Sequence, residues 1–109
     1  MEGKFYRVKS SYHPHTNMAK AALNMMTRTS AADLSTFNIF MTAVDTGWIN
    51  DENPVEKAAK YAEEHHFQTP LDEIDAAARI LDPIVVGVTQ LNEMPKFGIF
   101  LKDYYETEW

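Results

Sequence analysis

The sequence contains no cysteine. No disulfide, thiolate metal site or cysteine nucleophile is therefore available, and this composition is typical of a reducing compartment, so we expect a cytoplasmic location. Glycine is scarce too: the four glycines are scattered along the chain, which leaves no glycine-rich loop to hold a phosphate. A Gly-x-Ser-x-Gly elbow, the signature of many serine hydrolases, is also missing.

Long apolar runs are missing as well. The longest, Ile84 to Val88, has the length of a strand and is far too short to span a bilayer. Basic side chains occur among the first residues, but no apolar core follows them, unlike in a signal peptide. We therefore predict no membrane partner.

The chain is large enough for one core and too small for two. It has 109 residues, of which 45% are hydrophobic and 24% charged, close to the average of a folded globular protein. No repeat, low-complexity tract or linker divides it. We predict a single domain over residues 1–109.

Acidic residues outnumber basic ones, with a formal net charge of −6. Residues 1–40 carry five basic and two acidic side chains, whereas residues 41–109 carry five basic and fourteen acidic ones, so the net charge changes from +3 to −9. Such a surface repels nucleic acid over most of its area and attracts basic partners. The alternative is that the acids only keep a small protein soluble.

Hydrophobic periodicity and turn residues predict the element order β-α-α-α-α-β-β. The fold class is α+β, with about four helices packed on a small three-stranded antiparallel sheet made of the N-terminal strand and a C-terminal hairpin. The strongest core signal is a helical stripe in the second helix, Leu34, Phe37, Phe40, Met41 and Val44. The predicted strands cover residues 4–12, 84–91 and 96–104, and the predicted helices cover 16–28, 31–46, 54–66 and 71–81.

The acidic residues and the aromatic tail favour a non-enzymatic protein that binds a basic surface of a protein partner. Tyrosine and tryptophan are common interface anchors, and three of them stand among acids at the end of the chain. A regulator or inhibitor, such as a phage-type blocker of a host system, fits this description by analogy. The predicted partner-binding residues are Glu56, Glu63, Glu64, Tyr104, Tyr105, Glu106, Glu108 and Trp109.

A second hypothesis is single-stranded nucleic-acid or nucleotide binding by the N-terminal strand. Phe5, Arg7 and Lys9 alternate aromatic and basic groups on one face of that strand, with Tyr6 adjacent, and such a sheet face can stack bases and hold their backbone. The alternative is a strand with one buried face and one solvated cationic face.

A third hypothesis is a small metal-assisted hydrolase built on His13, His15 and His66. The neighbouring His65 diverges from His66 by about 100° around a helix, so the two cannot face one ion. Last-turn histidines also complement a helix dipole without any metal. We predict neither a metal nor a cofactor, and the two-sided apolar helix around Met18–Met26 is compatible with a homo-oligomer.

Overall fold

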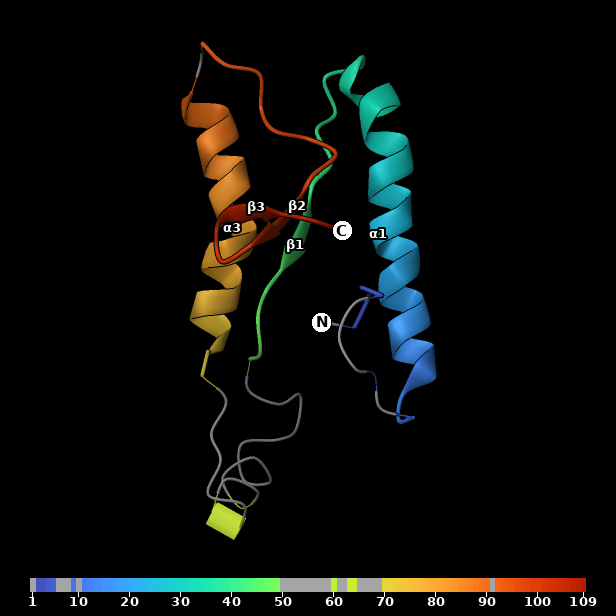
Figure 1. The fold of residues 1–109 in the computed structure, drawn as a ribbon. Helices are drawn as coiled ribbons and strands as arrows, with labels where there is room; N and C mark the ends of the chain where they lie inside the picture. Colours follow the sequence, from blue (N-terminus) through green and yellow to red (C-terminus); the bar gives the residue numbers. More distant parts are fainter. Residues whose placement is uncertain are drawn as a thin grey trace.

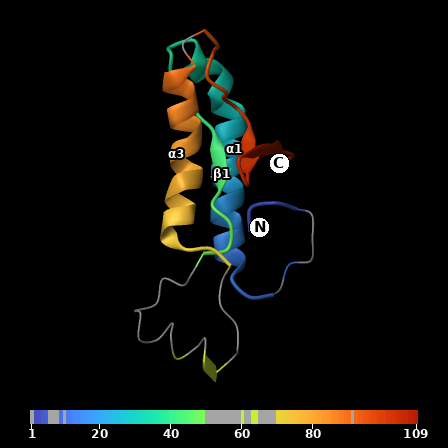
Figure 2. The same cartoon turned by 90° about the vertical axis from the view of Figure 1, so that its left-hand side faces the viewer.

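The computed structural model describes residues 2–5, 9, 11–49, 60, 63–64, 70–90 and 92–109. Two helices stand on either side of a small sheet (Figure 1), and the strand β1 runs between them (Figure 2). The elements are α1 (Pro14–Ser35), β1 (Ala43–Asp45), α3 (Glu73–Thr89), β2 (Phe100–Lys102) and β3 (Tyr105–Thr107).

The sheet is mixed. Its order is β1-β2-β3; β1 pairs with β2 in parallel, with Ala43 opposite Phe100, and β2 pairs with β3 antiparallel, with Phe100 opposite Thr107. A parallel pair needs a crossover connection, and α3 lies in the chain between β1 and β2. A two-residue hairpin suffices for the antiparallel pair.

The prediction of four helices on an antiparallel sheet is wrong, although the general class, α+β, stands. In the described part of the chain the sheet takes its third strand from Ala43–Asp45 and not from the N-terminus. The described residues of the predicted strand over 4–12, such as Lys4, Phe5 and Lys9, are not in a strand. Of the helix predicted over 54–66, only residues 60, 63 and 64 are described.

Helix α1 is longer than predicted because an apparent cap lies inside it. Ser30 to Asp33 resembles a capping box, yet the helix continues from Pro14 to Ser35. Hydroxyl groups within α1 bond back to its own carbonyls: Thr27 Oγ1 donates to Leu23 O at 3.1 Å and Thr29 Oγ1 to Met25 O at 2.8 Å. Side chains satisfied in this way do not interrupt a helix.

The separate helix predicted over 31–46 is wrong: residues 31–35 are the end of α1, and the chain then leaves the helix at a Schellman-type end. Asn38 has a φ of 58° and its N–H bonds to Ser35 O at 3.0 Å, while Ile39 N bonds to Leu34 O at 3.1 Å. These are the two hydrogen bonds of that motif, with asparagine in the left-handed position. The predicted core stripe is therefore broken, and Phe37 and Phe40 are exposed.

Helix α3 begins at a capping box and continues through a proline. Asp72 Oδ1 accepts from Asp75 N at 2.9 Å, and Asp75 Oδ2 accepts from Asp72 N at 3.3 Å, so two of the unpaired donors at the helix start are satisfied. The predicted stop at Pro83 is wrong, as is the strand predicted over 84–91, since α3 runs to Thr89.

The core lies where the helices meet the sheet. The buried hydrophobic residues of the described chain are Ala31, Ala76, Phe100 and Leu101, so both helices face the sheet with small side chains. Among the described residues no helix combines the length and the apolar character that a membrane span requires.

Candidate interaction site

The C-terminal hairpin turns through two residues, Asp103 and Tyr104, between β2 and β3. Both have a positive φ, 48° and 71°, as in a type I′ turn, whose twist matches that of paired strands. Asn-Gly or Asp-Gly usually occupies these positions, because a side chain in the left-handed region costs free energy. A tyrosine there places strain at an exposed tip, and strained residues cluster at binding sites.

Arg79 of α3 contacts both residues of this turn on the side that faces the helix. Its Nη2 lies 3.4 Å from Oδ1 of Asp103, and its Cζ lies 5.4 Å from the centroid of the Tyr104 ring. Its Nη1 donates to the carbonyl oxygen of Asp75 at 3.0 Å. The Arg79 side chain is 10% exposed and that of Asp103 57%, so the turn is fixed on its inner side and open to solvent on its outer side.

Trp109 anchors the end of the hairpin. Its ring centroid lies 5.8 Å from that of the buried Phe100. The Nζ of Lys4 lies 4.3 Å from the Phe100 ring centroid and donates a hydrogen bond to the carbonyl oxygen of Glu108. The last residues of the chain are therefore held against the sheet by the Trp109 ring and by the hydrogen bond to Glu108.

Half of the predicted partner-binding residues stand on the hairpin or directly after it. Tyr104, Tyr105, Glu106 and Glu108, which we call the tyrosine–glutamate surface, follow one another along the turn, β3 and the residue after it. Tyr105 is 78% exposed, and the other three are exposed as well. Trp109 is half-buried and acts as an anchor.

The acidic residues predicted on the third helix do not join this surface. Glu63 and Glu64 are exposed, and the short stretch that contains them lies apart from the hairpin in both views (Figures 1 and 2). Glu56 lies outside the described residues.

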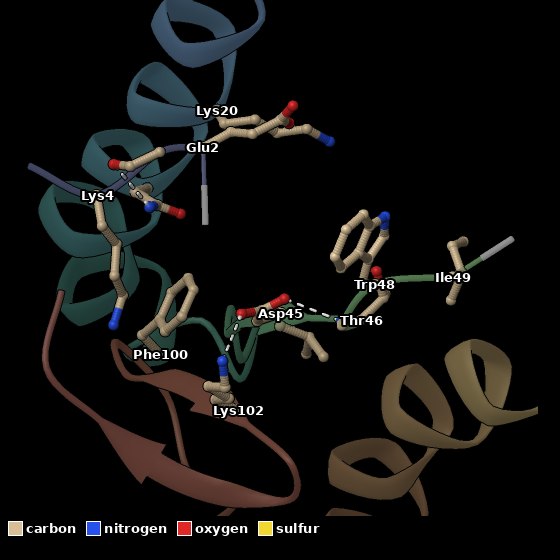
Figure 3. A pocket seen from close by; sticks show the side chains of 13 residues that line it. Glu2, Lys4, Lys20, Asp45, Thr46, Trp48, Ile49, Phe100 and Lys102 are labelled. Carbon is tan, nitrogen blue, oxygen red and sulfur yellow. Dashed lines mark hydrogen bonds and ion pairs between the residues drawn. The ribbon is translucent and has the colours of Figure 1, made fainter. Parts of the chain in front are cut away.

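A cleft of about 540 Å³ opens beside the sheet, between the N-terminal residues, α1 and the segment after β1. Lys102 and Asp45 form an ion pair of 3.7 Å on its floor, and Asp45 also accepts from Gly47 N at 2.9 Å. In Figure 3, Lys20 enters from α1, and the exposed Trp48 stands on the segment after β1. The lining mixes three lysines with two carboxylates.

The residues of the two other hypotheses are only partly described. Phe5 is almost fully exposed and Lys9 is exposed, whereas Tyr6 and Arg7 lie outside the described residues. The face predicted from Phe5, Arg7 and Lys9 required a strand, and neither Phe5 nor Lys9 is in one.

The histidines of the metal hypothesis are also only partly described. The ring centroids of His13 and His15 lie 5.9 Å apart, and both residues are exposed. His66 lies outside the described residues. In the part of the chain that is described, no three histidine, aspartate or glutamate residues gather closely enough to hold a metal ion.

Comparison with known proteins gives one relative and no family. No protein-family model matches the chain, and no solved structure does. The chain is 35% identical over 91 residues to the uncharacterized protein R665 of Acanthamoeba polyphaga mimivirus. The match covers 76% of this chain and 19% of that protein, so the chain spans about a fifth of its relative's length.

Sequence reasoning missed the two cations that build the hairpin. Arg79 stands among the acids of α3, and Lys4 was assigned to the predicted N-terminal strand over 4–12. Neither position carries a local signal, because their partners Asp103 and Glu108 are 24 and 104 residues away in the chain. The sequence prediction placed Asp103 and Tyr104 at the end of a strand over 96–104, so it also missed that they form the turn between β2 and β3.

Proposed function

We propose that this protein is a non-enzymatic binding protein that occupies a basic surface of a protein partner with its C-terminal hairpin. The observation that supports the proposal is the turn at Asp103 and Tyr104, which is held in a costly conformation by Arg79. It presents two exposed tyrosines beside Glu106 and Glu108. Aromatic groups on a rigid support lose little conformational entropy on binding, and they are frequent interface anchors.

The charge of the surface defines the kind of partner. Exposed carboxylates flank the tyrosines, and the whole chain carries a net charge of −6. Complementary charge raises the rate of encounter and disfavours acidic partners. Occupation of a basic surface makes the protein a regulator or inhibitor of whatever that surface otherwise binds.

Affinity capture tests this proposal. The purified chain is used as bait at low salt in lysate of its source cells, and bound proteins are eluted with a salt gradient and identified by mass spectrometry. We expect a basic protein that elutes sharply, because exposed charge pairs are screened by salt.

Matched variants then locate the contact. Tyr105→Ser combined with Glu106→Gln should weaken binding of the captured partner at least tenfold. The control is Tyr12→Ser combined with Glu93→Gln, which removes an equally exposed tyrosine, 75% against 78%, and an exposed acid outside the hairpin. Equal affinity of both double variants, or capture of no basic protein, would refute the proposal.

A second candidate function, nucleotide binding, is favoured by the cleft. Trp48 is 65% exposed at a cleft that also receives Lys20 and Lys102, and an aromatic ring with nearby cations is suited to a base and its phosphates. The carboxylates of Glu2 and Asp45 oppose this binding. Titration with ATP should quench the fluorescence of Trp48 and leave that of a Trp48→Phe variant unchanged. If the fluorescence of neither protein changes, nucleotide binding at this cleft is refuted.

A further inference from the structure

Helix α3 turns its apolar face away from the protein. The residues that face the sheet are small or polar, with Ala76 buried and Arg79 nearly so. Six large apolar side chains of α3 are between 48% and 72% exposed, Ile80 on the flank and the other five on the opposite side: Ile74, Ile80, Leu81, Ile84, Val85 and Val88. An amphipathic helix of a monomer has the reverse arrangement.

All of these exposed residues except Ile80 follow a heptad spacing. Ile74, Leu81 and Val88 are seven residues apart, and each interval holds two further apolar positions, Ala77 with Ala78 and Ile84 with Val85. A repeat of this kind places its members along one seam of a helix, where they pack against another helix. The charged residues of α3 lie off this seam: with 100° per residue, Asp75, Arg79 and Asp82 point at least 60° away from Leu81 and Ile74.

We propose that α3 pairs with α3 of a second copy of this chain, antiparallel, with Leu81 on the twofold axis. The seam is self-complementary about Leu81. An antiparallel partner places Ile74 opposite Val88 of the other copy and the alanine pair opposite the larger Ile84 and Val85, so small side chains meet large ones.

A parallel pair would fit worse in two respects. It would bring alanines against alanines and leave a void, and it would crowd Ile84 and Val85 against their equivalents. It would also place Asp72, Glu73 and Asp75 of both copies side by side at one end. The antiparallel arrangement separates these acids and aligns the two helix dipoles favourably.

The area is sufficient for a dimer. The six exposed side chains leave on the order of 600 Å² per copy uncovered, so pairing that covered them completely would bury at most about 1,200 Å² in total, the lower end of the range of specific interfaces. The seam does not include the hairpin, so a dimer would carry two tyrosine–glutamate surfaces. This inference does not depend on the proposed function, since different residues carry it.

The first experiment compares two matched substitutions by sedimentation equilibrium. Leu81→Asp places like charges next to each other at the axis, and we expect the dimer dissociation constant to rise at least 100-fold. Leu23→Asp on α1 is the control, because Leu23 is 51% exposed and Leu81 54%, and we expect it to leave the dimer intact. Circular dichroism checks that both variants keep their helices. A monomeric parent chain at 100 μM, about the upper range for a specific pair, or a Leu81→Asp dimer would overturn the inference.

The second experiment tests the orientation and needs no disruptive variant. Because the chain has no cysteine, each introduced cysteine is unique. Leu81→Cys should form a disulfide-linked dimer with itself, whereas Ile74→Cys should do so only when mixed with Val88→Cys, since two copies of residue 74 would lie about 21 Å apart along the axis. Efficient self-linking of Ile74→Cys, or none for Leu81→Cys, would contradict the antiparallel pair.

Discussion

Lys4 is joined to Glu108, 104 residues further along the chain, by a hydrogen bond from its Nζ to the main-chain carbonyl oxygen. Lys4 is 3% exposed, and its ammonium group lies over the Phe100 ring. The residue before it packs closely on α1: Asn24 Nδ2 donates to Gly3 O at 3.3 Å, and a Cβ on Gly3 would lie 2.8 Å from the main chain of Lys20. The first residues therefore connect α1 to the C-terminal strands.

Substitution of Lys4 should destabilise the protein. Lys4→Met keeps the length of the side chain and removes a charged donor and a cation–π contact, so we expect the free energy of unfolding to fall by about 1–3 kcal/mol. Urea unfolding measures this. Lys20→Met, at an exposed position, should change it by less than about 0.5 kcal/mol. Similar values for the two variants would show that the Lys4 contacts contribute little.

Loss of the Arg79 side chain should make the hairpin more mobile. Arg79→Met removes the ion pair with Asp103 and the contact with Tyr104, each worth about 0.5–1 kcal/mol because the partners are exposed. We expect faster amide hydrogen exchange in residues 102–107, with α3 amides little changed. Arg28→Met, at an exposed arginine of α1, serves as the control. Unchanged exchange at the hairpin would mean that Arg79 does not hold the turn.

Substitution of Tyr104 should lower the affinity for the partner without lowering the stability of the protein. Tyr104→Gly relieves a left-handed residue, worth about 1–2 kcal/mol, and loses the Arg79 contact, worth about 0.5–1 kcal/mol. Thermal unfolding should therefore show equal or slightly higher stability, while affinity for the captured partner falls. Tyr105→Gly, which weakens a strand residue, should lower both. A clear loss of stability in Tyr104→Gly would show that the turn is not strained.

The sequence supported the general class of the fold, α+β, but not the positions of most elements: the hairpin predicted over 84–104 lies instead at Phe100–Thr107. A helix start was predicted at residue 71, and α3 begins nearby, at Glu73 after the cap Asp72. The run from Ile84 to Val88 was assigned to a strand because β-branched residues favour strands and Pro83 precedes them. The heptad relation between Ile74, Leu81 and Val88 was visible in the sequence and pointed to a helix.

Other features depend on contacts that no local pattern contains. Ser30 to Asp33 has the residues of a cap, and nothing nearby distinguishes a true cap from hydroxyls bonded inside a helix. The strand at Ala43–Asp45 is three residues long and exists because Phe100–Lys102 pairs with it from more than fifty positions away. Short strands of this kind are determined by tertiary pairing more than by propensity. The same applies to Lys4 and Arg79 in the candidate site.

Pro83 provides a test of how α3 is stabilised. It lies inside the helix, has no N–H to donate to the carbonyl of Arg79, and costs about 3 kcal/mol relative to alanine at an interior position. Pro83→Ala should therefore raise the free energy of unfolding by about 1–2 kcal/mol. The gain is smaller than the full cost of the proline, because the packing of its half-buried ring is lost. Pro95→Ala is the control, because Pro95 is also half-buried but lies outside any helix, and it should leave stability equal or lower. If Pro83→Ala were no more stable than Pro95→Ala, the helix would have to end near Pro83, and the heptad seam from Ile74 to Val88 would be interrupted with it.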